Sequence, residues 1–136
     1  MEITASDLFK NIEDEYIRYR KKWGQNVDRL PFGRRPNGAG GYHLEIHDDG
    51  RMALVGTDRD METERRETCS IDELLYWIFQ GSANSRAGMY QPSEMKDPRQ
   101  AWFPKALDEI EKLNPAWRHR LELEQQEILR KHPFSN

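Results

Sequence analysis

The densest run of hydrophobic positions in the chain lies within TCSIDELLYWIFQG at residues 68–81. Ser70 precedes this run as a candidate N-cap, and Glu73 follows three residues later, which is the pattern of a capping box. The sequence therefore predicts a helix over residues 71–80 that ends at Gly81. Because apolar side chains cover most of the helix circumference, we expect this helix to lie at the centre of the core.

A second helical pattern of apolar residues lies near the N-terminus. Ser6 is a candidate N-cap, and Gly24 marks the end of the pattern. The sequence therefore predicts an amphipathic helix over residues 6–23, within an N-terminal segment 1–24, followed by a loop rich in glycine and proline. Its buried stripe is expected to consist of Leu8, Ile12, Tyr16, Tyr19 and Trp23.

The segment 41–68 has the pattern of β-strands. YHLEIH at residues 42–47 alternates apolar and polar positions, and the DDG that follows is a hairpin-turn signal. RMALVGT at 51–57 and METERRET at 61–68 then complete a predicted antiparallel meander of three strands. We expect one face of this sheet to be buried. The side chains predicted to face inward are Tyr42, Leu44 and Ile46, and those predicted to face solvent are His43, Glu45 and His47.

Prolines divide the C-terminal half into further helices. Small residues favour a short helix over 82–91, which QPSEMKDP at 91–98 would end. Asp97–Pro98 and Asn114–Pro115 are cap-plus-proline signals that predict two more helices. Pro104 lies inside the first of these, so that helix either kinks there or restarts with the proline in its first turn. The residues of the last helix predicted to point inward are Trp117, Leu121 and Ile128.

These patterns together predict an α+β fold. An N-terminal helix (1–24) precedes a small antiparallel meander of about three strands (41–68), and a mostly helical C-terminal half (70–132) packs on the sheet. At 136 residues, the chain is expected to form a single domain, 1–136, that is large enough to bury a core.

Composition narrows the function classes. The chain is 33% charged and 36% hydrophobic, with a formal net charge of −3, so nothing favours nonspecific binding to nucleic acid or to an anionic membrane. Cys69 is the single cysteine, which fits a reducing compartment. The N-terminus lacks the apolar run of a secretory signal, and no apolar run reaches the ~20 residues of a membrane-spanning helix. We therefore expect a cytoplasmic protein.

Candidate catalytic and metal-binding groups are sparse. His43 and His47 would lie ~13 Å apart along an extended strand at ~3.3 Å per residue, so the pair cannot bind one ion, although His43 or His47 with Glu45 could if other ligands joined them. Cys69 precedes a predicted helix N-terminus, yet no histidine lies near it in the sequence. No signature enzyme motif is present, so we predict a binding protein with no catalytic residues, no cofactor and no metal.

Several blocks of the sequence resemble a known family. These are ERRET at 64–68, DELLYWIF at 72–79, DPRQAWF at 97–103, LDEIEKLNPAW at 107–117 and RKHPF at 130–134. Their order and spacing are similar to those of the immunity protein 63 family of bacterial polymorphic toxin systems, over roughly residues 41–134. The matching positions expected to maintain the fold are Glu64, Arg65, Thr68, Asp72, Glu73, Leu75, Trp77, Arg99, Phe103, Asn114, Pro115 and Trp117.

The resemblance implies a function and a partner. Such a protein stays in the cytoplasm of the producing bacterium and binds a cognate toxin domain so that the toxin cannot act on its own cell. Many intracellular toxin domains are nucleases with basic clefts, which an acidic surface would complement. The acidic residues predicted to contribute to the toxin interface are Asp48, Asp49, Asp58, Asp60, Glu62 and Glu64.

Other interpretations are open at this point. The same acidic residues also suit a solvated hairpin whose charges discourage pairing at the sheet edge. The chain could be a small intracellular adaptor for a protein that is not a toxin, or a metal-dependent enzyme that uses the His43, Glu45 and His47 face. The sequence predicts neither the oligomeric state nor a role for Cys69.

Overall fold

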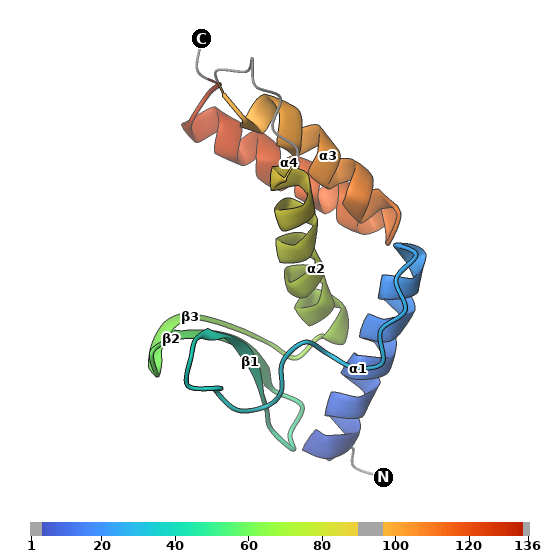
Figure 1. The fold of residues 1–136 in the computed structure, drawn as a ribbon, viewed down its shortest axis with the longest axis vertical. Coiled ribbons are helices and arrows are strands. Elements are labelled where there is room, and N and C mark those ends of the chain that lie inside the picture. Colours follow the sequence, from blue (N-terminus) through green and yellow to red (C-terminus); the bar gives the residue numbers. More distant parts are fainter. Residues whose placement is uncertain (1–3, 90–96, 135–136) are drawn as a thin grey trace. The chain divides into compact units, whose positions relative to one another are not determined.

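A computed structural model describes residues 4–89 and 97–134 of the chain (Figure 1). A helix is followed by three strands and then by three helices, so the α+β fold class is confirmed. The chain divides into two compact units, Met1–Leu75 and Tyr76–Asn136. Helix α2 begins in the first unit and ends in the second.

Helix α1 (Ala5–Lys22) opens the first unit, and its N-cap is Thr4 rather than the predicted Ser6. The reason is a reciprocal capping box. The Thr4 hydroxyl accepts a hydrogen bond from the Asp7 backbone N–H at 3.1 Å, and the Asp7 carboxylate accepts one from the Thr4 N–H at 3.4 Å. The predicted stripe is buried at Leu8, Ile12, Tyr16 and Tyr19, while Trp23 is half-buried at the C-cap.

The segment after α1 folds back along the helix and then along the sheet. The Leu30 backbone N–H donates to the Glu13 carboxylate at 3.1 Å, which fixes the segment to α1. Farther on, the Gly33 carbonyl accepts a 2.9 Å bond from the Leu44 N–H, and the Arg34 guanidinium donates to the Ile46 carbonyl at 3.2 Å. This segment therefore covers part of the outer edge of the first strand.

Three strands form the predicted antiparallel meander, in the order β1-β2-β3. They are β1 (Gly41–Ile46), β2 (Met52–Asp58) and β3 (Met61–Thr68). Leu44 of β1 stands opposite Leu54 of β2, and a bulge between Gly56 and Thr57 shifts the register toward the second turn. Because β2 lies between the other two strands, it is the most protected of the three.

The prediction of one buried face is wrong for the middle of the sheet. Every residue from Met52 to Gly56 in β2 is buried, so both faces of this strand are covered. His43 was expected to face solvent but is only 4% exposed, whereas Tyr42 was expected to face inward and is 45% exposed. An alternating pattern of apolar and polar residues indicates which way each side chain points. It does not indicate whether the sheet is covered on one side or on both.

Helix α2 spans Ile71–Gly88, which is longer than predicted. The Glu73 N–H donates to the Ser70 hydroxyl at 3.2 Å, so Ser70 caps the helix as expected. Gly81 does not end it, and the separate helix over 82–91 is wrong, because the helix continues without interruption to Gly88. A glycine inside a helix costs only about 1 kcal/mol, and the buried Ala83 and Ala87 carry the packed face onward.

Helices α3 (Arg99–Glu111) and α4 (Pro115–Lys131) complete the second unit. Most of the break predicted at 91–98 lies outside the described residues. Helix α3 runs through Pro104 without restarting. Asn114 caps α4 as predicted, since its side-chain oxygen accepts from the Ala116 N–H at 2.9 Å.

Aromatic rings form the core of the second unit. The Trp117 ring lies 6.0 Å from the Phe79 ring and 5.9 Å from the Tyr76 ring, measured between centroids. Tyr76 is buried but its hydroxyl donates to the Glu124 carboxylate at 2.9 Å. The inward position predicted for Ile128 is wrong, since this residue is 44% exposed and Gln125 is buried in the same stripe.

Candidate functional site

The six acidic residues predicted to contact a partner do not form one cluster. Asp48 and Asp49 lie in the turn between β1 and β2, whereas Asp58 and Asp60 lie at the turn between β2 and β3. Consecutive turns of an antiparallel meander lie at opposite ends of the sheet, and a strand of this length separates them by roughly 20 Å at ~3.3 Å per residue. The structure therefore divides the predicted surface into two ends and the strand β3.

The carboxylates of the first turn are engaged within the fold. Asp48 Oδ1 accepts a 2.8 Å hydrogen bond from the Ala5 backbone N–H, so this side chain caps α1. Asp49 accepts from the Arg51 backbone N–H at 3.1 Å and from its guanidinium at 2.8 Å. The bond from the Arg51 backbone is the main reason that the pKa of Asp49 is lowered.

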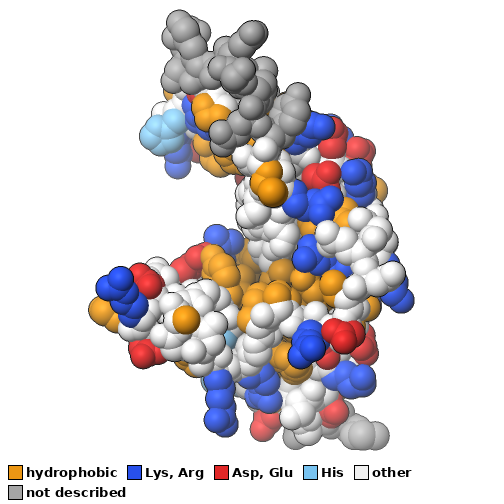
Figure 2. Space-filling model, viewed as in Figure 1, with side chains coloured by type: hydrophobic (Ala, Val, Ile, Leu, Met, Phe, Trp, Pro, Cys, Tyr) orange, Lys and Arg blue, Asp and Glu red, His pale blue; other side chains and the backbone are white. Residues whose placement is uncertain are grey.

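Strand β3 presents paired charges. Glu64 accepts a hydrogen bond from the Tyr42 hydroxyl at 2.9 Å and forms an ion pair with Arg66 at 2.8 Å. Glu62 is paired with Arg65 at 2.6 Å. These contacts cross-link the outer strand, and they balance its negative charges with positive ones. Acidic and basic side chains are likewise interspersed on the face of the molecule in Figure 2.

The turn between β2 and β3 carries two carboxylates that are not paired with any described residue. Asp58 and Asp60 are exposed, and neither carboxylate makes a hydrogen bond or an ion pair with any residue that the structure describes. Arg59 and Asp60 both have positive φ, of 52° and 68°. Only two residues connect the strands here, and positive φ at both is the geometry of a type I′ turn. Met61 follows and is 73% exposed.

The face proposed from the sequence for metal binding holds an ion-pair cluster instead. Arg65 donates to both oxygens of Glu45, at 2.5 and 3.2 Å, across the intervening strand. These bonds lower the pKa of Glu45 and raise the pKa of Arg65. His43 is buried, and its Nδ1 has no hydrogen-bond partner among the described residues, while His47 is exposed. Within residues 4–89 and 97–134, no three histidine, cysteine or acidic side chains are arranged to hold a metal ion.

Cys69 is exposed and follows the end of β3 directly. It forms no disulfide. Among the described residues, Cys69 makes no side-chain hydrogen bond or ion pair that would give this thiol a chemical role.

A cavity on α1 was not predicted from the sequence. Its volume is about 690 Å³, and it lies between Tyr16 and Arg20 of the helix and the segment 26–31. Burial raises the pKa of Tyr16, and the neighbouring Arg20 guanidinium partly offsets this rise. The sequence does place Tyr16 and Arg20 four residues apart, and residues with that spacing lie side by side on a helix. That spacing alone does not reveal that the following loop returns and forms the other wall of an open cavity.

None of the helices that the structure describes is both long and apolar enough to span a lipid bilayer. Neither the search of curated proteins nor the search of solved structures found a match to this chain. The family model described as immunity protein 63 matches residues 48–127, which include both sheet turns, β3 and most of the helical half. Since this match covers more than half of the 136 residues, the chain belongs to the immunity protein 63 family.

Proposed function

We propose that this protein binds and neutralises a cognate toxin domain in the cytoplasm of the bacterium that produces the toxin. The observation that carries the proposal is membership of the immunity protein 63 family over residues 48–127. Neutralisation by binding requires a folded surface and no reacting groups. We propose that the protein acts in this way, as a stoichiometric inhibitor and not as an enzyme.

Co-expression with the product of the adjacent gene tests this function. A toxin gene beside this one should arrest growth when expressed alone, and co-expression of this chain should restore growth. The two proteins should also co-purify, and protection in vitro should be complete at about a one-to-one ratio. Protection at a ratio far below equimolar would indicate catalysis and would contradict the proposed mode of action.

For the toxin interface, we propose the acidic residues of the meander, led by the turn between β2 and β3. The support is the exposure of Asp58 and Asp60 and the absence of a pairing group for either carboxylate among the described residues. The proposed toxin class is a nuclease, because a nuclease cleft is basic and would attract these charges. Electrostatic attraction of this kind acts mainly on the association rate.

The double variant Asp58→Asn/Asp60→Asn tests this interface. Asparagine is suitable because it tolerates the positive φ at position 60, whereas lysine would add backbone strain. The association rate with the toxin should fall several-fold at low ionic strength, and the difference should shrink as salt screens the charges. Asp14→Asn/Asp108→Asn is the matched control, since these side chains are 59% and 64% exposed on α1 and α3. Equal rates for both variants at every salt concentration would rule out this surface.

A further inference from the structure

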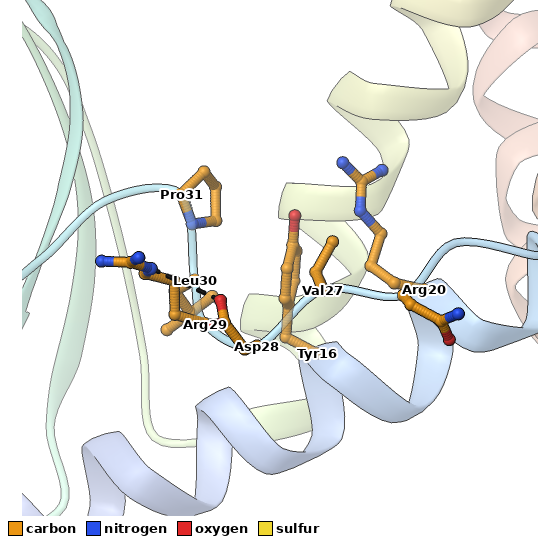
Figure 3. A pocket seen from close by; sticks show the side chains of 8 residues that line it. Tyr16, Arg20, Val27, Asp28, Arg29, Leu30 and Pro31 are labelled. Carbon is orange, nitrogen blue, oxygen red and sulfur yellow. Dashed lines mark ion pairs between the residues drawn. The ribbon is translucent and has the colours of Figure 1, made fainter.

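The cavity on α1 has walls that are fixed by hydrogen bonds (Figure 3). Its inner surface includes Tyr16 and Leu30, which are 2% and 4% exposed. The Leu30 N–H donates to the Glu13 carboxylate at 3.1 Å, and the Gln25 N–H donates to the Arg20 carbonyl at 3.1 Å. Because both bonds tie the returning segment to the helix, the cavity exists before any ligand arrives. Such preformed concave sites are typical of binding sites.

Arg20 is the cation of this cavity that lacks an acidic partner. Within residues 4–89 and 97–134, its guanidinium forms no ion pair, and its buried Nε has no hydrogen-bond acceptor. The nearby arginines differ in this respect, since Arg18 is paired with Glu15 at 2.6 Å and Arg29 with Asp28 at 3.4 Å. A buried N–H donor without an acceptor is unfavourable, and no carboxylate among the described residues balances the charge of this guanidinium.

Aromatic rings hold this guanidinium in place. The Arg20 Cζ atom lies 5.4 Å from the centre of the Tyr16 ring and 5.6 Å from the centre of the Trp23 ring. Arg20 also hydrogen-bonds with the Tyr16 side chain, and its Nε is buried, so a carboxylate would meet the terminal N–H groups of the guanidinium, which can form two parallel hydrogen bonds. The structure thus provides a cation that is oriented and lacks a counter-ion.

We propose that this cavity receives a glutamate or aspartate side chain from a partner protein, with its carboxylate paired to Arg20. If the partner is the toxin domain, this inference rests on the proposed function. A protein segment is the expected ligand because one ion pair at an open site contributes little by itself. The apolar contacts that a segment would add are available on Val27, Leu30 and Pro31.

The rim of the cavity is compatible with an acidic ligand. Asp28 also lines it and would repel a carboxylate, but the Arg29 guanidinium lies 3.4 Å away and balances this charge. In Figure 3 the Tyr16 ring separates Arg20 from the Asp28–Arg29 pair.

Binding of the purified toxin domain to variants of the full chain tests the proposal. Arg20→Gln should weaken binding about fivefold, the upper range for one ion pair at an open site, and Arg20→Lys should restore only part of the loss because an ammonium cannot form the two parallel bonds. Arg18→Gln is the matched control on the same helix and should bind like the wild type. Wild-type affinity in folded Arg20→Gln would overturn the inference. Failure of the wild-type chain to bind the toxin would instead overturn the proposed function.

A second measurement needs neither a variant nor the toxin. The wild-type chain is labelled with ¹⁵N, and the side-chain Nε–H resonances of its arginines are followed during titration with the peptide acetyl-Glu-Leu-Glu-Leu-Glu-amide. The Arg20 resonance should shift with this peptide and stay in place with the analogue that carries glutamine instead of glutamate. No shift of the Arg20 resonance, or equal shifts with both peptides, would overturn the inference.

Discussion

Asp48 caps α1 from a distant part of the chain, because its Oδ1 atom lies 2.8 Å from the backbone nitrogen of Ala5. The first turn of a helix has backbone N–H groups with no partner inside the helix. The Thr4 hydroxyl accepts a hydrogen bond from the Asp7 N–H, and the Asp48 carboxylate accepts one from the Ala5 N–H. The turn between β1 and β2 thereby joins the N-terminal helix to the sheet.

The variant Asp48→Ala should therefore reduce stability. Loss of a capping carboxylate leaves the Ala5 N–H without its acceptor, and the free energy of unfolding should fall by about 1 kcal/mol. Urea denaturation followed by circular dichroism measures this change. Asp49→Ala is the control, since among the described residues that carboxylate bonds to Arg51 within the same turn and to no other element. A loss in Asp48→Ala no larger than that in Asp49→Ala would contradict the capping role.

The pair of Glu45 and Arg65 should make stability depend on pH in the acidic range. Hydrogen bonding to Arg65 is the main cause that lowers the pKa of Glu45 from its ordinary value of 4.5. A carboxyl group with a lowered pKa in the folded state stabilises the fold fully above its unfolded pKa, and this contribution is lost as the pH falls through the folded pKa. The stabilisation should thus be constant above about pH 5 and should disappear below it.

The variant Glu45→Gln isolates this contribution. Its free energy of unfolding should lie below that of the wild type at neutral pH, and the two curves should converge as the pH falls below 4.5. Glu127→Gln provides a comparison on α4, where the partner Arg130 is only three residues away and joins no distant elements. A difference between Glu45→Gln and the wild type that does not change with pH would rule out ionisation of Glu45 as its cause.

Local patterns predicted most of the elements of this fold. Turn and cap chemistry is local, so DDG between the strands and Asn114–Pro115 before α4 lead directly to the observed structure. Gly81 was predicted to end α2, but the helix continues because burial of Ala83 and Ala87 outweighs the weak helix propensity of glycine. Packing decides this position, and packing is not visible in a short window of sequence.

The candidate site was less predictable, because it depends on distant pairing. Of the six acidic residues, five are exposed and Glu64 is half-buried, but the sequence does not tell which carboxylates are engaged. Asp48 meets Ala5 across the fold, and Glu64 meets Tyr42 across the sheet. Asp58 and Asp60, at the other turn, have no such partner among the described residues.

Arg99 should control the order of residues 132–134, which follow α4. Its guanidinium donates to the carbonyls of His132 and Pro133 at 2.7 and 2.9 Å while it pairs with the buried Asp97 at 2.7 Å. A lysine at this position cannot supply the fork of donors that holds both carbonyls. In Arg99→Lys, carboxypeptidase should therefore remove residues 132–134 several-fold faster than in the wild type.

Arg130→Lys is the control for the terminal contact. Arg130 lies in the last turn of α4 and pairs with Glu127 at 2.7 Å, so its replacement leaves the two carbonyls held. Digestion of this variant should match that of the wild type. Equal digestion of the Arg99→Lys and Arg130→Lys variants would show that the Arg99 contacts do not restrain the terminus.

Gln125 should tolerate an apolar replacement better than a charged one. It is 6% exposed, and its Nε2 donates to the Phe103 carbonyl at 3.0 Å, which joins α4 to α3. Gln125→Leu loses this bond and should cost about 1 kcal/mol of unfolding free energy. Gln125→Glu would bury a carboxylate against a carbonyl oxygen and should cost about 3 kcal/mol at neutral pH. Thermal and urea unfolding measure both values, with Gln126→Glu as the exposed control on the same helix. A smaller loss in Gln125→Glu than in Gln125→Leu would mean that the side chain is hydrated in solution and does not bridge the two helices.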